Sequence, residues 1–288
     1  MATHTRARGQ VREMLRARPG RTPLVLDERG ASKTPGVNRA TAEADGARDA
    51  KTLRDLQERL YAEDRRAVLL VLQGMDTSGK DGTITHVIGN VNPQGVHIRG
   101  FGKPTAEELR HDFLWRIRRA LPPTGFIGIF NRSHYEDVLV VRVKRLAPKS
   151  VWSKRYDAIN AFEREVTASG TTIVKVCLRI SYAEQGERLL ARLEDPTKWW
   201  KFNPADLGDR ARWRDYMAAY EDALAKCSTE AAPWYVIPAD KKWYRDWAVT
   251  RILIETLEEM DPRYPKPEFD VAEELALTKK TIAKTPPR

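Results

Sequence analysis

The fold of this chain is decided by the stretch Gln73-Gly74-Met75-Asp76-Thr77-Ser78-Gly79-Lys80-Asp81-Gly82-Thr83. The apolar run 67–72 before it is typical of a buried strand, and the spacing of 84–88 after it suits the start of a helix. Strand, loop and helix around the pattern G-x-x-x-x-G-K form the context of a phosphate-binding P-loop. Its backbone N–H groups, the helix N-terminus and the lysine would all favour bound phosphate.

The residue after the lysine departs from the usual pattern. Ser or Thr is expected there to hold Mg²⁺, but this chain has Asp81, and a second aspartate, Asp76, lies inside the loop. Two carboxylates would repel a bare polyanion, so they make sense mainly if Mg²⁺ bridges them to phosphate. The alternative is an ordinary strand-to-helix turn, in which glycines and aspartates serve turn and cap geometry.

Length and composition favour one large cytoplasmic domain. The chain has 288 residues, of which 41% are hydrophobic, and it shows neither an apolar run of membrane-span length nor an N-terminal signal-peptide pattern. Its two cysteines lie far apart, which suits a reduced compartment. The net charge of +10 predicts a polyanionic partner, but composition does not choose among nucleic acid, an anionic membrane and a phosphate polymer.

Strands and helices alternate between residues 51 and 262, which predicts one α/β domain with a parallel sheet between helices. The predicted strands are 67–72, 96–101, 125–130, 172–178 and 234–237. Apolar residues recurring every three or four positions predict helices at 109–121 and 156–166, and a closing helix is expected at about 241–260. We expect residues 1–50 to form a basic, partly flexible extension and 263–288 to form a tail.

A polar insertion at about 186–230 interrupts this alternation and predicts an active-site lid. Helical patterns flank a break at 195–204, which carries Lys198 and Lys201 beside two tryptophans. We expect both lysines to contact phosphate, whereas Trp213 lies on an apolar stripe and is expected to pack between helices.

A second acidic cluster follows the predicted strand 125–130. Open parallel sheets bind ligands beyond the carboxyl ends of their strands, so Arg132 could meet a transferring phosphoryl group and Glu136 or Asp137 could meet Mg²⁺. The strand end where a Walker-B aspartate is expected holds Asn131, a weaker ligand. A surface salt bridge is the alternative for Arg132, and a phosphohistidine is a minor alternative for His134.

Several separated stretches together resemble the family-2 polyphosphate kinases. They lie between about residues 50 and 260 and occur in the family's order: Leu72–Thr83, Lys103–Thr105, Arg110–Arg116, Phe130–Leu139, Arg192–Pro196 and Trp234–Tyr244. The resemblance implies a P-loop kinase fold similar to thymidylate kinase, with a helical lid. It also implies reversible, Mg²⁺-dependent transfer of the terminal phosphoryl group of inorganic polyphosphate to a nucleotide, and a homo-oligomer, either a dimer or a tetramer.

The resemblance also implies roles for individual residues. Asp76 matches the loop aspartate that binds metal or orients the acceptor phosphate, Lys80 matches the phosphate-loop lysine, and Lys103 matches a basic residue near the acceptor phosphates. Many members have Asp in place of Asn131, so the second metal position passes to Glu136 or Asp137. The Asn form resembles a subgroup that accepts AMP as well as ADP.

The sequence thus predicts a complete site. The catalytic residues are Asp76, Lys80, Arg132, Glu136 and Asp137, and the metal ligands are Asp76, Glu136 and Asp137. Phosphate is bound by Gly74, Thr77, Ser78, Gly79, Asp81, Gly82, Thr83, Lys103, Lys198 and Lys201, and the nucleotide by Arg116 and Asn131. The partners are polyphosphate and AMP or ADP, with neither nucleic acid nor membrane.

Two other functions remain open at this point. An ATP-dependent nucleoside-monophosphate kinase would have the same fold. A polyphosphate-dependent kinase would form ATP from ADP and polyphosphate without added ATP, whereas the ATP-dependent kinase would not. A non-catalytic polyanion-binding protein would use the basic N-terminus, so deletion of residues 1–50 would abolish its function but leave catalysis largely intact in a kinase.

Overall fold

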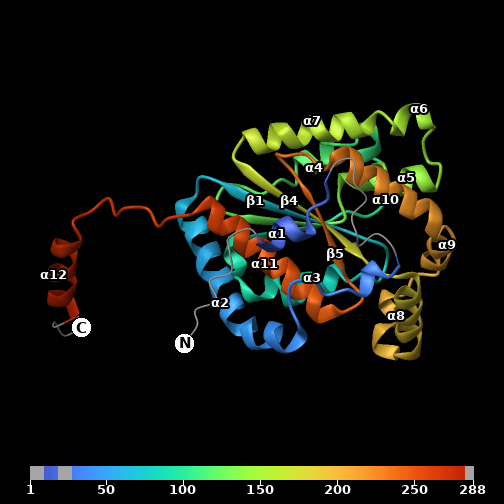
Figure 1. Ribbon diagram of the computed structural model, residues 1–288. Coiled ribbons are helices and arrows are strands. Elements are labelled where there is room, and N and C mark those ends of the chain that lie inside the picture. Colours follow the sequence, from blue (N-terminus) through green and yellow to red (C-terminus); the bar gives the residue numbers. More distant parts are fainter. Residues whose placement is uncertain (1–9, 19–27, 283–288) are drawn as a thin grey trace.

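A five-stranded sheet forms the centre of the computed structural model, which describes residues 10–18 and 28–282 (Figure 1). The strand order is β2-β3-β1-β4-β5, and every neighbouring pair is parallel. The strands are β1 (Ala67–Gln73), β2 (Val96–Gly100), β3 (Ile127–Asn131), β4 (Thr171–Arg179) and β5 (Trp234–Pro238). The prediction of an α/β fold with a parallel sheet is therefore confirmed.

The register of the sheet brings the two predicted motifs to one edge. Leu72 of β1 lies opposite Asn131 of β3, so the glycine loop after β1 and the acidic segment after β3 leave the sheet side by side. All seven residues of β1 are buried because helices cover both faces of the central strand. The chain adds β2 and β3 on one side of β1 and then β4 and β5 on the other. This change of side leaves a crevice at the carboxyl end of β1, where open parallel sheets bind ligands.

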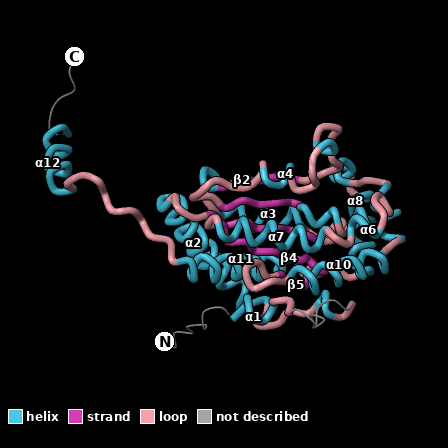
Figure 2. Tube along the Cα trace, turned by 90° about the horizontal axis from the view of Figure 1, so that it is seen from above, coloured by secondary structure: helices cyan, strands magenta, loops and turns pink. Residues whose placement is uncertain are grey.

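Helices form a layer on each face of the sheet (Figures 1 and 2). The longer helices are α2 (Arg39–Glu63), α7 (Arg155–Ala168), α8 (Tyr182–Glu194), α10 (Trp213–Cys227), α11 (Lys242–Met260) and α12 (Val271–Ile282). The shorter ones are α1 (Gln10–Leu15), α3 (Lys80–His86), α4 (Trp115–Arg118), α5 (Val140–Val143), α6 (Lys149–Trp152) and α9 (Ala205–Ala211).

Each helical layer has its own apolar cluster. One joins α7 and α10 to the sheet through side chains such as Phe162, Tyr220 and Phe130. The other joins α1, α2 and α11 to the opposite face through side chains such as Leu15 and Leu253. Fully buried apolar side chains on both faces of a sheet are the main source of its stability, so the sheet is a firm support for the loops at its edge.

The N-terminal segment differs from its prediction as a loosely packed extension. In its described part, Val11, Leu15 and Ala17 are buried, and the backbone N–H of Ala17 donates to Trp234 at 2.8 Å. Glu255 of α11 accepts the N–H of Arg12 at 2.9 Å, which ties α1 to α11. Removal of residues 1–50 would thus open the core and truncate α2, so we no longer expect that deletion to leave catalysis intact.

The predicted helix 109–121 is also wrong in extent. The structure has a short 3₁₀ turn at Glu108–Arg110 and one helical turn, α4, at Trp115–Arg118. The carboxylate of Asp112 accepts the backbone N–H of Leu114 at 2.9 Å, and such a side-chain bond competes with the helical pattern. Leu109, which began the apolar pattern, is exposed.

The C-terminal segment extends away from the body of the molecule, and α12 lies at its end (Figures 1 and 2). None of the residues described in α12 is buried. Within the described parts of the chain, no helix combines the length and the apolar character that crossing a membrane requires.

Candidate active site

The phosphate loop between β1 and α3 has a backbone that requires glycine at two positions. Gly74 and Gly79 have φ angles of 156° and 106°, which side-chain-bearing residues rarely adopt. A Cβ at Gly74 would lie 2.7 Å from the carbonyl oxygen of Leu178, and one at Gly79 would lie 2.9 Å from Cζ of Arg245. Close approach of neighbouring groups thus adds to the conformational reason for both glycines.

Lys80 closes this loop onto itself. Its Nζ donates to the carbonyl oxygens of Gly74 at 2.7 Å and Met75 at 3.2 Å, so the ammonium lies over the loop. Burial lowers the pKa of Lys80, and the nearby charge of Asp76 opposes that shift. The hydroxyls of Thr77 and Ser78 are buried and lack a hydrogen-bond partner among the residues that the structure describes. Unpaired donors beside a buried ammonium fit a phosphate ligand.

The segment after β3 meets the loop through two side-chain contacts. Arg132 pairs with the Oδ1 of Asp76 at 2.8 Å, and the amide of Asn131 donates to the Oδ1 of Asp81 at 2.8 Å. Arg132 itself has a φ of 64°, an unusual value for a residue with a side chain. The structure thus brings together Asp76, Lys80, Arg132 and Asn131, as the sequence predicts.

The two neighbouring acidic residues point in different directions. Glu136 is half-buried and accepts a bond from Gln73 at 3.1 Å, and burial raises its pKa although Arg132 opposes the shift. Asp137 instead pairs with Arg155 of α7 at 2.8 Å, and burial raises its pKa to about 6. Asp137 is therefore occupied away from the phosphate loop.

A cleft of about 620 Å³ opens between the phosphate loop, the segment after β3 and the lid. Among the residues that the structure describes, eight Lys and Arg side chains and three aspartates line it, a formal balance of +5. The basic residues are Lys80, Arg132, Arg188, Arg192, Lys198, Lys201, Lys242 and Arg245, and the acidic ones are Asp76, Asp81 and Asp206. A cleft with this excess of positive charge attracts polyanions.

The lid contributes positive charge to the cleft. The polar break in its sequence forms short helices in the structure. Lys198 and Lys201 belong to a 3₁₀ helix at Pro196–Lys201 and line the cleft, so the structure places both where their predicted contact with phosphate is possible. Lys198 pairs with Asp195 at 2.7 Å, an exposed ion pair that is weak in water. Trp213 is the first residue of α10 and packs against the core, which confirms its prediction as a packing residue.

Five charged cleft residues were missed as site residues by the sequence analysis, and three of them show how the cleft is built; the five are Arg188, Arg192, Asp206, Lys242 and Arg245. Arg188 of α8 donates to the carbonyl oxygens of Thr77 at 2.9 Å and Ala239 at 2.8 Å, and thereby joins the lid to the phosphate loop. Arg245 of α11 lies against Gly79. Asp206 of α9 faces the cleft, where burial and then the charge of Asp76 raise its pKa to about 6.

A signal for one of these residues was present in the sequence. Lys241, Lys242 and Arg245 follow β5, and the rule that ligands bind beyond the carboxyl ends of strands applies to β5 as it does to β3. Arg188 and Asp206 lie on α8 and α9 among other charged residues, so their sequence spacing does not set them apart from ordinary surface charges.

Two predicted residues lie beside the cleft rather than in it. Lys103 is exposed and is not part of the cleft wall, although Gly102 before it is. Arg116 donates to the carbonyl oxygen of Gly102 at 3.0 Å and lies over the ring of Phe101, so it supports the rim. Gly74, Ser78 and Thr83 shape the loop from behind, and Thr83 bonds to Gly79 at 3.1 Å.

The carboxylates provide oxygen atoms for a divalent cation, but not in the predicted combination. Within residues 10–18 and 28–282, no group of three His, Cys, Asp or Glu side chains is arranged to hold a metal. Of the predicted ligands only Asp76 lines the cleft, because Glu136 and Asp137 bond to Gln73 and Arg155. Asp76 and Asp206 repel each other across the cleft, and Mg²⁺ with phosphate oxygens and water needs no more than one or two carboxylates.

Comparisons with known proteins agree on one family. The family model of polyphosphate kinase 2 (PPK2) matches residues 36–265. The chain is 56% identical over 218 residues to an AMP/ADP-polyphosphate phosphotransferase of Meiothermus ruber, covering 76% of this chain and 82% of the relative. It is 48% identical over 226 residues to an ADP-polyphosphate phosphotransferase of Rhodopseudomonas palustris, covering 74% and 78%.

A solved structure gives the same result for the fold. The crystal structure of polyphosphate kinase 2 from Arthrobacter aurescens TC1 has a TM-score of 0.90 and 47% identity, covering 94% of this chain and 96% of that one. This likeness confirms the predicted P-loop kinase fold.

Proposed function

The chain belongs to the polyphosphate kinase 2 family, and we propose that it transfers the terminal phosphoryl group of inorganic polyphosphate to a nucleotide, reversibly. The observation that carries this proposal is the cleft, in which a phosphate loop and Arg132 face a row of lid cations. A short nucleotide tail would occupy only part of such a cleft. A long phosphate chain carries about one negative charge per unit and would pair with more of these cations than a short nucleotide tail.

The phosphate loop would hold the reacting phosphates through its backbone N–H groups and Lys80. In-line phosphoryl transfer gives the protein little covalent chemistry to perform, so positioning and charge stabilisation account for the rate. Phosphate would take Lys80 Nζ away from the two carbonyl oxygens that it now contacts, and the unpaired hydroxyl of Thr77, which lines the cleft, would gain an acceptor.

Arg132 would stabilise the charge that develops on the transferred group. Its guanidinium already lies in the cleft and is held by Asp76, so it needs little reorganisation to meet a phosphoryl group. Enzymes of this family generally need a divalent metal. We propose that Mg²⁺ is held by Asp76 and Asp206 together with phosphate oxygens, where it would neutralise charge on the substrates.

We propose both AMP and ADP as acceptors, with Asn131 and the rim held by Arg116 near the nucleotide. The relatives' names support this range, because one is an AMP/ADP-polyphosphate and the other an ADP-polyphosphate phosphotransferase. The bond from Asn131 to Asp81 places the amide at the mouth of the phosphate loop. A homo-oligomer and a cytoplasmic location stay predictions, and light scattering on the purified protein measures the first.

A nucleotide panel tests the proposed function. AMP, ADP and the other nucleoside mono- and diphosphates are each incubated with polyphosphate and Mg²⁺, and products are separated by chromatography. We expect ADP to yield ATP and AMP to yield ADP, with no reaction when Mg²⁺ is chelated. Transfer that requires ATP as donor would instead identify a nucleoside-monophosphate kinase.

A further inference from the structure

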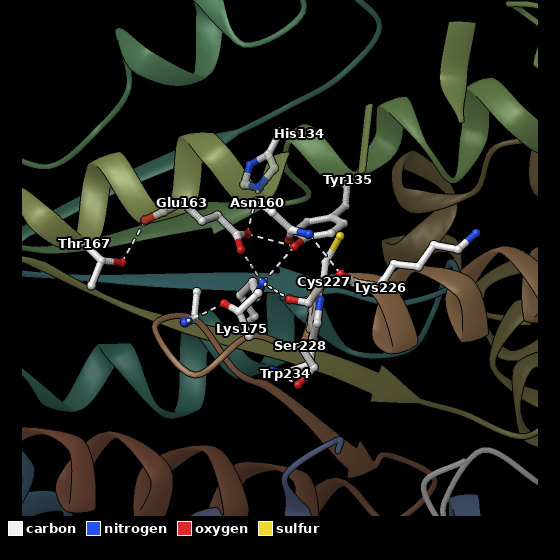
Figure 3. A network of polar contacts seen from close by, with 12 residues as sticks. His134, Tyr135, Asn160, Glu163, Thr167, Lys175, Lys226, Cys227, Ser228 and Trp234 are labelled. Carbon is white, nitrogen blue, oxygen red and sulfur yellow. Dashed lines mark hydrogen bonds and ion pairs between the residues drawn. The ribbon is translucent and has the colours of Figure 1, made fainter. Parts of the chain in front are cut away.

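A buried polar network joins His134 and Tyr135 to Glu163 and Lys175 (Figure 3). Glu163 of α7 and Lys175 of β4 form an ion pair at 2.5 Å, and both side chains are at most 1% exposed. The hydroxyl of Tyr135 donates to Glu163 at 2.8 Å and accepts from Lys175 at 2.8 Å. His134 Nε2 lies 3.2 Å from the same carboxylate. Lys175 completes its bonding with the carbonyl oxygen of Cys227 at 2.7 Å.

Two opposite charges are thus held where water is excluded. Burial alone would raise the pKa of Glu163, but Lys175 and His134 lower it, so the carboxylate stays ionised. Burial also lowers the pKa of His134, which keeps its ring neutral. Such a pair has a strong preference for one geometry, because any displacement leaves a charge without its partner.

Residues 132–137 connect this network to the active site. Arg132 and Glu136 face the phosphate loop, where they contact Asp76 and Gln73. His134 and Tyr135, between them in sequence, face the opposite way and enter the network. The 3₁₀ turn His134–Asp137 itself holds His134, Tyr135 and Glu136, and only Ser133 lies between it and Arg132, so we expect a shift of Tyr135 to move Arg132 with it.

The backbone at Arg132 shows why a fixed support is needed. A φ of 64° is costly for a residue with a side chain, and such a conformation persists only when its surroundings determine it. The backbone N–H of Arg132 bonds to Leu72 at 3.0 Å, which fixes one side of the turn. The bonds of Tyr135 and His134 fix the other side.

We propose that Lys175 and Glu163 are positioning residues for phosphoryl transfer, which hold Arg132 in place through Tyr135 and His134. The inference rests on the proposed function, since it concerns the rate of that reaction. Neither residue touches the cleft, so neither is a catalytic residue. A displacement of about 1 Å at a reacting group can lower a rate about a hundredfold, so a network of this kind can control kcat from a distance.

A purely structural role is the competing explanation, and a paired substitution separates the two. The single substitution Lys175→Met leaves the Glu163 carboxylate buried and unpaired, so it is expected to lower Tm strongly. The double substitution Lys175→Met with Glu163→Gln removes both charges at nearly constant volume and should restore most of that loss. A structural role predicts that kcat returns with Tm, whereas a positioning role predicts that it does not.

The experiment measures Tm, kcat and both KM values in the full-length protein, with ADP and polyphosphate as substrates. For the double variant we expect Tm near the parental value, a kcat about tenfold lower and KM values within about threefold. Tyr135→Phe, which removes one hydroxyl at constant shape, should lower kcat in the same direction. Glu255→Gln is the matched control, because Glu255 is equally buried but lies on the other face of the sheet.

Coupling to Arg132 completes the test. In an Arg132→Ala background, the double substitution should change kcat less than about threefold, because the group that it positions is gone. Parental kcat in the double variant would overturn the proposal, as would an equal loss in the Arg132→Ala background. If the double variant does not fold, parental kcat in a folded Tyr135→Phe protein would overturn it. Absence of ATP formation by the parental protein would count against the proposed function, not against the positioning network alone.

Discussion

The phosphate loop and the lid segment 195–203 both carry lysines, but the loop lysine is buried and the lid lysine is exposed to solvent. In the loop, Lys80 is 8% exposed and held by two carbonyl oxygens. In the lid, the side chain of Lys198 is 51% exposed, and Trp200 is 79% exposed. The loop is thus prepared before substrate arrives, whereas the lid cations remain free to adapt to it. We infer that the loop governs the chemical step and that the lid governs the binding of polyphosphate.

The largest effect is expected at Lys80. Lys80→Ala removes the buried charge beside the reacting phosphates, and we expect kcat to fall about 10³-fold with a normal fold by circular dichroism. Lys242→Ala, in the same cleft but outside the loop, is the control and should fall far less. A Lys80→Ala protein with parental kcat would contradict the inference that the loop governs the chemical step.

Arg132 should come next. Arg132→Ala is expected to lower kcat about 10²-fold, with a small change in the KM for ADP, because the guanidinium acts on charge that develops during transfer. Arg132→Lys keeps the charge but loses the planar group that pairs with Asp76, so we expect it to recover only part of the rate. A large rise in KM with little change in kcat would instead show that Arg132 acts in substrate binding.

The lid lysines should show the opposite kinetic pattern. Replacing both Lys198 and Lys201 by Ala should raise the KM for polyphosphate about three- to tenfold and leave kcat nearly unchanged. The effect should shrink at high salt, because the distance over which exposed charges attract each other is about 10 Å at 0.1 M salt and falls as the salt concentration rises. Initial rates at several salt concentrations measure this, and a loss confined to kcat would contradict the division between loop and lid.

Lys103 is expected to show the smallest effect. Family resemblance assigned it to the acceptor phosphates, but the structure places it outside the cleft wall and exposed. Lys103→Ala should therefore change kcat and KM for AMP and ADP less than about twofold. A loss of tenfold or more would show that the rim moves inward when nucleotide binds.

The sequence predicted those parts of the site that depend on local spacing. Glycine positions and the following lysine predict a phosphate loop wherever a strand and a helix flank them, and the structure has this strand, loop and helix around Gly74, Gly79 and Lys80. The approach of Arg132 to Asp76 followed from the parallel sheet, because neighbouring strands end at one edge.

Side-chain direction within a short turn could not be predicted in the same way. Glu136 and Asp137 are adjacent and chemically alike, yet one bonds to Gln73 and the other to Arg155 of a distant helix. The same limit applies to the N-terminal segment. Its composition resembles that of a flexible extension, but in its described part Val11, Leu15 and Ala17 are buried, and α1 is held to α11 through Glu255.

Transfer of label from polyphosphate to ADP tests the central claim most directly. Polyphosphate carrying ³²P is mixed with ADP, Mg²⁺ and the purified protein, without ATP, and the nucleotides are separated. We expect labelled ATP, and we expect the rate of its formation to fall about 10³-fold in Lys80→Ala. Label that stays in polyphosphate, while the same protein moves phosphate from ATP to AMP, would contradict it.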